Sequence, residues 1–136
     1  SGDASIAHSA AYCQLLEGLT GVEAPLRAQA IRCIAMELER LANHTGDLGA
    51  LAQDVGFLPT ASFCGRLRGD WLNASALLCG NRFGRSLVCP GGVRFDIDDE
   101  MAADLQSRVE AAFRDLTGAA NLLWSTPTVL EQVVTA

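Results

Sequence analysis

The chain has 136 residues, enough for one domain with a hydrophobic core, and 49% of them are hydrophobic while only 6% are aromatic. Its formal net charge of −6 argues against nonspecific binding of nucleic acid. We expect neither a membrane span nor a signal peptide, because no long uncharged apolar run and no basic leader are visible. The five cysteines form no CxxC pair, which indicates reduced, mostly buried thiols in a cytoplasmic protein rather than disulfides or a zinc site.

Helical patterns fill the first half of the chain. Residues 3–19 predict a first helix, with Asp3 or Ser5 as its N-cap. A short linker then leads into a long helix from Pro25 to Asp54, where the missing N–H of the proline suits the first turn. Its apolar face is predicted to contain Ile31, Ile34, Leu38, Leu41, Leu48, Ala52 and Val55.

Two further helices and a glycine-rich segment make up the second half. Residues 60–79 predict a third helix, and residues 80–97, with four glycines and a proline, predict an irregular loop or small hairpin. Asp98 or Asp99 is expected to cap a fourth helix that ends near Ser125. The apolar residues expected to face inward are Phe63, Leu67, Trp71, Leu72 and Leu78 on the third helix, and Met101, Leu105, Val109, Ala112, Phe113 and Leu116 on the fourth.

These patterns predict an all-α protein, an up-and-down helical bundle around one long central helix with a loop or small hairpin near residues 80–97. Residues 1–136 are expected to form a single helical domain. A last apolar pattern after Pro127 stops abruptly, which suggests a fragment of a longer polypeptide.

The long helix also carries a row of ionisable side chains beside its apolar face. Its members are Glu37, Arg40, His44, Asp47 and Asp54. The row is either a solvated helix face or a polar seam along an internal cavity, and periodicity does not choose between the two. The histidines, His8 and His44, fall on different predicted helices, where a lone histidine is more often packed than a metal ligand.

Several sequence motifs are more specific than the composition of a helical protein alone would produce. They are AHSAAYCQLLEGLTGVEAPLRAQAIR at residues 7–32, ELERLANHTGDLGALAQDVGF at residues 37–57, GNR at residues 80–82 and PGGV at residues 90–93. In this order they closely resemble the large catalytic subunit of membrane-bound, energy-converting nickel–iron hydrogenases of the formate hydrogenlyase type. They also resemble the homologous quinone-site large subunit of respiratory complex I, the NADH-quinone oxidoreductase.

The resemblance argues against a nickel–iron centre in this chain. In the hydrogenases a CGxC motif that helps to hold the metals shortly precedes AHS. Here Ser1 and Ala4 stand at the cysteine positions, and neither offers a thiolate for nickel or iron. None of the five cysteines falls at a ligand position, so we expect no metal ligand and no cofactor within the chain.

In the complex I branch the same cavity takes a quinone headgroup, and the resemblance implies roles residue by residue. His44 matches the histidine of an NH motif and Asp54 the aspartate of ALDxGA, which makes both candidate catalytic residues in an internal polar network. Candidates for lining the quinone site or its polar network are His8, Glu37, Arg40, Asp47, Arg68 and Arg82; surface charge remains an adequate explanation for Glu37, Arg40 and Asp47. Structural roles are implied for Glu17, Arg27, Pro90, Gly91 and Gly92, with Glu17 and Arg27 able to pair across the linker.

The first functional expectation is therefore a core segment of a hydrogenase/NADH-quinone-oxidoreductase-like large subunit. It would contribute to a quinone- or proton-coupled electron-transfer site beside a partner small subunit that carries an iron–sulfur cluster. The resemblance associates the parent complex with quinone and NAD binding, a cytoplasmic location at the membrane face, and membrane contact only through other subunits. The isolated fragment should be inactive. A degenerate, non-catalytic scaffold subunit is the alternative, and a true nickel–iron hydrogenase subunit ranks last.

Overall fold

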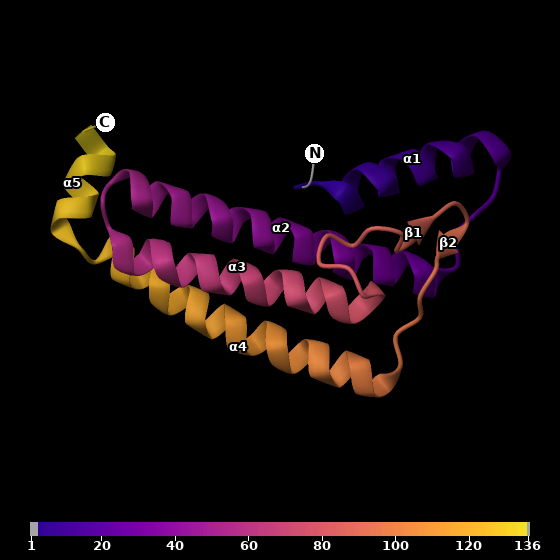
Figure 1. Ribbon diagram of the computed structural model, residues 1–136. Coiled ribbons are helices and arrows are strands. Elements are labelled where there is room, and N and C mark those ends of the chain that lie inside the picture. Colours follow the sequence, from indigo (N-terminus) through magenta and orange to yellow (C-terminus); the bar gives the residue numbers. More distant parts are fainter. Residues whose placement is uncertain (1–2, 136) are drawn as a thin grey trace.

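A computed structural model describes residues 3–135, and it confirms the mostly helical fold (Figure 1). The elements are α1 (Ser5–Thr20), α2 (Leu26–Asp54), α3 (Leu58–Cys79), β1 (Val88–Cys89), β2 (Gly92–Val93), α4 (Asp99–Trp124) and α5 (Pro127–Thr135). Helices α2, α3 and α4 lie side by side, with α3 in contact with both others. Helix α1 and the hairpin lie at one end of this layer, and α5 lies at the other.

The predicted hairpin is confirmed as two short antiparallel strands. Val88 pairs with Val93, and Cys89 pairs with Gly92. Gly91 in the turn has φ +82°, a left-handed conformation that glycine adopts without steric cost. This small hairpin contacts both α1 and α2, so it links the two helices at their shared end.

The helix starts differ in how their free backbone N–H groups are satisfied. Asp98 caps α4 as predicted, because its carboxylate accepts a hydrogen bond from the Met101 N–H at 2.7 Å. The predicted caps of α1 are wrong: Ala4 occupies the N-cap position, and no side chain there caps the helix. Glu39 of α2 supplies the acceptor instead, as described below.

The main core lies between α2, α3 and the elements that cover them. Eight of the predicted inward-facing residues are buried there, namely Ile31, Leu38, Leu67, Trp71, Leu72, Leu78, Leu105 and Ala112, and Leu41, Met101, Val109 and Leu116 are partly buried against them. The buried Trp71 indole donates a hydrogen bond to Thr45 Oγ1 at 3.0 Å, which satisfies both polar groups between α2 and α3.

Three residues predicted to face inward are exposed. Ile34 and Phe63 are each 39% exposed, and Phe113 is 60% exposed. In a layer of helices each helix is covered only where a neighbour lies against it, so an apolar face wider than the contact leaves its edges in solvent. The prediction was therefore wrong for these three edge positions.

A second, smaller core lies at the α5 end, and we call it the end cluster. Its buried residues are Ala52, Leu123 and Val129, with Leu48, Val55, Phe57, Ala61 and Val133 packed against them. Helices α2, α4 and α5 meet there. Among residues 3–135, no helix combines the length and the apolarity that a bilayer crossing requires.

Candidate functional site

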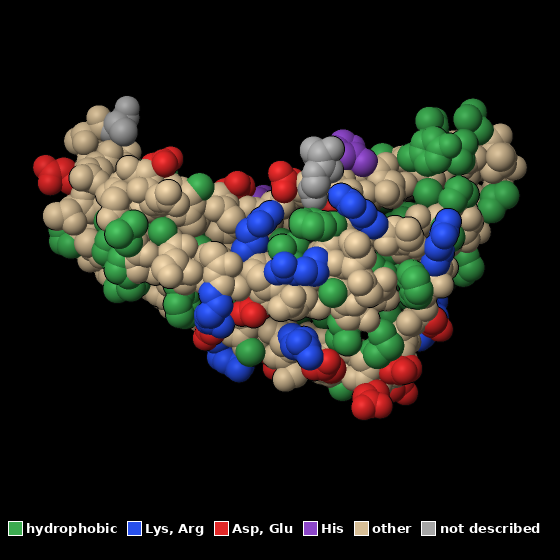
Figure 2. Space-filling model, viewed as in Figure 1, with side chains coloured by type: hydrophobic (Ala, Val, Ile, Leu, Met, Phe, Trp, Pro, Cys, Tyr) green, Lys and Arg blue, Asp and Glu red, His purple; other side chains and the backbone are tan. Residues whose placement is uncertain are grey.

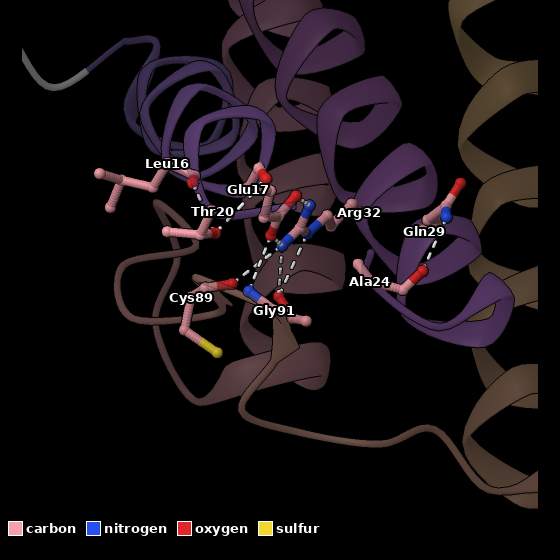
Figure 3. A network of polar contacts seen from close by, with 9 residues as sticks. Leu16, Glu17, Thr20, Ala24, Gln29, Arg32, Cys89 and Gly91 are labelled. Carbon is pink, nitrogen blue, oxygen red and sulfur yellow. Dashed lines mark hydrogen bonds and ion pairs between the residues drawn. The ribbon is translucent and has the colours of Figure 1, made fainter. Parts of the chain in front are cut away.

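Arg32 is the most completely partnered charged residue of the fold. It is 4% exposed, in the phase of α2 that also buries Ala28, Ile31 and Ala35. Its guanidinium donates to both carboxylate oxygens of Glu17, at 2.6 and 3.1 Å (Figure 3). It also donates to two backbone carbonyls of the hairpin, Cys89 O at 2.8 Å and Gly92 O at 2.9 Å.

Glu17 completes this network from α1. Its carboxylate accepts the Gly91 N–H at 2.8 Å in addition to the two bonds from Arg32. The hydrogen bond from Arg32, followed by the one from Gly91, lowers the pKa of Glu17 against the opposing effect of burial. The network therefore joins α1, α2 and the hairpin, which gives Glu17, Gly91 and Gly92 structural positions (Figure 3).

Arg27 does not pair with Glu17, so that part of the expectation was wrong. Its exposed side chain binds Asp96 Oδ1 at 2.7 Å and the Ile97 carbonyl, in the segment before α4. Arg27 lies in the first turn of α2, whereas Arg32 lies on the face that meets α1 and the hairpin. The bond from Arg27 lowers the pKa of Asp96, helped by the Ile97 N–H. Pro90 lies exposed beside the hairpin turn.

An open groove of about 560 Å³ runs beside this network between α1 and α2. Its wall includes Glu17 and Arg32, whose polar atoms are already engaged with each other and with the hairpin. These two charged groups therefore stabilise the fold and are not directed into the groove toward a ligand.

A second cavity brings predicted site residues together. This cleft of about 530 Å³ is lined by Asp3, Asn43, Gly46, Asp47 and Arg68, and we call it the α2–α3 cleft. Arg68 reaches over α2 because Gly46 has no side chain; a Cβ there would lie 3.1 Å from Arg68 Cδ. Arg68 Nη2 lies 3.5 Å from Asp3 Oδ1, a loose ion pair at the rim.

Arg82 adjoins the same region from the loop after α3. With Arg68 it lines a small pocket next to the cleft, and its Nη2 would lie 3.6 Å from a Cβ at Gly69. Figure 2 shows basic side chains gathered along the middle of the viewed face, over α3 and this loop. Of the predicted residues, Asp47 and Arg68 thus line the α2–α3 cleft, and Arg82 lines the small pocket beside it.

The other predicted residues lie on the surface. Glu37 and Arg40 pair with each other as exposed neighbours on α2. His8 on α1, and His44 and Asp54 on α2, are exposed side chains. Within residues 3–135 the ionisable row is therefore a solvent-exposed helix face, and the internal polar network expected for His44 and Asp54 is not formed by these residues.

The cysteines within residues 3–135 are not brought together into a metal site. Cys13 and Cys64 are buried, and burial raises the pKa of both thiols. Cys79 and Cys89 are partly buried, whereas Cys33 is exposed. Among residues 3–135, no group of three or more His, Cys, Asp or Glu side chains is arranged to hold a metal ion. Ala4 is the N-cap residue of α1, and Ser1 lies outside the described residues.

Sequence reasoning missed Arg32, Asn43 and Glu39 as residues with specific partners. A signal for Arg32 was available, because a charged residue in the apolar phase of a helix must be partnered when it is buried. Asn43 and Glu39 offered no such signal, because their partners are far away in sequence. Asp3, which precedes α1, is 40 residues from Asn43, and Ile6 in α1 is 33 residues from Glu39.

Comparison with known proteins agrees with the sequence resemblance. The family described as "Respiratory-chain NADH dehydrogenase, 49 Kd subunit" matches residues 54–135. An NADH-quinone oxidoreductase subunit of Azoarcus sp. (strain BH72) is 40% identical over 91 residues, and the same subunit of Acidithiobacillus ferrooxidans is 41% identical over 91 residues. Each alignment covers 67% of this chain and 22% of the relative.

The chain belongs to the 49 Kd subunit family of the respiratory-chain NADH dehydrogenase. A further relative, the corresponding NADH-quinone oxidoreductase subunit of Albidiferax ferrireducens, is 34% identical over 105 residues, which are 77% of this chain and 25% of the relative. The chain thus spans about a quarter or less of the length of the curated relatives that it matches.

Proposed function

We propose that the chain is a core segment of the large subunit of an NADH-quinone-oxidoreductase-type redox complex, where it forms one wall of a quinone- or proton-coupled electron-transfer site. The observation that carries this proposal is the α2–α3 cleft, in which Asp47 and Arg68 line one opening in a chain of this family. The family resemblance made both residues candidates for the site, although surface charge was an adequate explanation for Asp47.

The side chains around the cleft have chemistry that suits a quinone headgroup. The Arg68 guanidinium donates hydrogen bonds to a carbonyl oxygen, and the Asp47 carboxylate accepts from a hydroxyl. Reduction of a quinone consumes protons as well as electrons, and histidine and aspartate are side chains that supply or orient protons. On this proposal His44 and Asp54 serve that purpose on the adjoining face of α2.

The exposure of this face fits a site completed by other chain segments. The aligned part of this chain covers 22% of the Azoarcus relative, so most of the sequence of that relative lies outside the alignment. We assign closure of the cleft to such segments and electron supply to a partner subunit with an iron–sulfur cluster. The assembly then lies at the cytoplasmic face of a membrane, which it contacts through other subunits.

The test is acceptor reduction by the full-length protein in its complex. His44→Ala and Asp54→Asn are each expected to lower the rate of quinone reduction by about tenfold or more, as loss of a proton-transfer group does. Arg68→Ala should raise the quinone KM. The matched control is Arg108→Ala, which removes an exposed arginine that pairs with Asp104 on α4. Unchanged turnover in both His44→Ala and Asp54→Asn, with intact circular dichroism, would remove these roles.

A scaffold function is the second candidate, and the Arg32 network favours it. This polar network joins α1, α2 and the hairpin, and its two charged groups, Arg32 and Glu17, bind each other. If His44→Ala, Asp54→Asn and Arg68→Ala all keep full turnover while Arg32→Ala abolishes assembly of the complex, the chain is a scaffold. Metal analysis of the same preparation addresses the hydrogenase alternative, for which stoichiometric nickel is required; we expect iron without nickel.

A further inference from the structure

Helix α1 begins without a capping group of its own. Ala4 is the N-cap residue, no side chain caps the helix locally, and its first turn contains no acidic residue. The first N–H groups of any helix have no partner inside the helix, and the positive end of the helix dipole lies there. The start of α1 therefore needs an acceptor from elsewhere.

Glu39 of α2 provides this acceptor with both carboxylate oxygens. Oε1 accepts the Ile6 N–H at 2.8 Å, and Oε2 accepts the Ala7 N–H at 3.0 Å. A bidentate carboxylate at a helix start combines two hydrogen bonds with a favourable charge–dipole interaction. The contact fixes the first turn of α1 against α2 across 33 residues of sequence.

The same end of α1 is held from its other sides. The Ile6 side chain is 1% exposed and lies against Gly84, where a Cβ would come within 2.4 Å of Ile6 Cδ1. Asn43, one turn after Glu39 on α2, donates to the Asp3 carbonyl. Asp3 then lines the α2–α3 cleft opposite Arg68.

We propose that Glu39 is a positioning residue, which fixes the first turn of α1 and through it the Asp3 wall of the α2–α3 cleft. Glu39 does not line that cleft but lies at the small pocket beside it, and both of its carboxylate oxygens are engaged by the Ile6 and Ala7 N–H groups. It therefore acts through the backbone of residues 3–7. The effect on a quinone rests on the proposed function above; the effect on α1 does not.

The experiment compares Glu39→Ala and Glu39→Gln with Glu37→Ala in the full-length protein. Glu37 is the matched control, because it is an acidic residue of the same helix that is exposed and pairs with Arg40. Hydrogen exchange of the Ile6 and Ala7 amides is expected to become about tenfold faster in Glu39→Ala, as loss of a helix cap predicts. Glu39→Gln keeps one acceptor oxygen and should give a smaller increase, and Glu37→Ala should give none.

The second readout separates positioning from a purely structural role. In quinone reduction, Glu39→Ala should raise KM several-fold while kcat changes by less than about twofold, because the cleft is displaced and the reacting groups remain. Unchanged exchange at Ile6 and Ala7 would overturn the inference. Faster exchange with an unchanged KM would overturn the link to the cleft. If the unsubstituted protein reduces no quinone, the proposed function fails, and amide exchange alone decides whether Glu39 fixes α1.

Discussion

At the scale of single residues, Arg32 draws together three segments that are far apart in the sequence. Its planar guanidinium offers five donors in a fixed geometry, which suits a carboxylate on one side and two carbonyls on the other. A lysine ammonium could not reproduce the bidentate contact with Glu17. The burial of this charge is tolerable because each of its three nitrogens donates to at least one oxygen.

Arg32→Ala is expected to lower the free energy of unfolding by about 3 kcal/mol, the usual cost of breaking a buried ion pair by removing one partner. The change leaves the Glu17 carboxylate without its ion partner and removes the side-chain donor of the Cys89 and Gly92 carbonyls. Urea unfolding measures the effect. Arg40→Ala, which removes an exposed arginine of the same helix, should cost much less. Equal losses in the two variants would mean that the network contributes nothing beyond a surface pair.

The lowered pKa of Glu17 predicts a stability that depends on pH. In the unfolded chain its carboxyl returns to the ordinary value of 4.5, whereas Arg32 and the Gly91 N–H keep it lower in the fold. The contribution is complete above the unfolded value and is lost as the pH falls through the folded one. The difference in free energy of unfolding between the native chain and Glu17→Gln should therefore shrink below pH about 4.5.

The control for this titration is the same substitution in an Arg32→Ala background. Because the hydrogen bond from Arg32 is the main cause of the lowered pKa, the double variant should lose most of the dependence on pH. A stability difference that stays constant from neutral pH into acid would contradict the assignment.

At the scale of elements, the approach of α2 to α3 depends on a missing side chain. Gly49 is buried in α2, and a Cβ at this position would lie 2.9 Å from Cys64 Cβ on α3. Both atoms are attached directly to helix backbones, so neither can move away without shifting a helix. The close contact also brings Gly46, three residues before Gly49, and Arg68, four residues after Cys64, to the cleft.

Gly49→Ala is therefore expected to destabilise the fold by about 1–3 kcal/mol, the usual range for overpacking. The loss should appear even though alanine favours a helix by up to about 1 kcal/mol over glycine. Gly65→Ala is the matched control, since Gly65 lies in α3 with no atom near the added Cβ, and it should stabilise slightly. Thermal unfolding of both variants gives the comparison, and a stabilised Gly49→Ala would show that the helices have room.

Local sequence signals were sufficient to predict the helices and the hairpin, but not to predict which residues of different elements contact one another. The proline and glycine boundaries, the Asp98 cap and the helical period act within a few residues, so the long helix and the hairpin could be located from sequence. Whether Phe63 or Phe113 is covered depends on the position of a neighbouring helix. Arg27 was expected to be able to pair with Glu17, whereas the fold places Arg32 against Glu17 and Arg27 against Asp96.

The candidate site was predictable to a similar degree. Asp47 and Arg68 were proposed through a resemblance, and their meeting in one cleft depends on Gly46 and on the packing of α2 against α3. His44 and Asp54 lie on the same helix but are exposed. The spacing of residues along α2 shows which of them share a face, but whether that face is buried depends on the segments that pack against it.

At the scale of the whole molecule, the separation of the two cores implies unequal stability along the helical layer. The main core is formed by α1–α4, the hairpin and the segments that flank the hairpin, whereas α5 is attached through the end cluster, with Val129 as its buried residue. Proteins open locally where few buried apolar contacts hold an element. We therefore expect α5 to open without unfolding of the main core.

Val129→Ala tests this arrangement. Val129 is 3% exposed, and loss of its two methyl groups should weaken the attachment of α5 by about 1–2 kcal/mol, or about tenfold in its opening equilibrium. Hydrogen exchange should accelerate in residues 127–135 and stay unchanged around Leu67 in the main core. Val134→Ala, at an 80% exposed position of the same helix, should accelerate neither region. If exchange instead rises equally along α2, α3 and α4, the end cluster and the main core unfold as one cooperative unit, and α5 stabilises the whole layer, including the α2–α3 cleft.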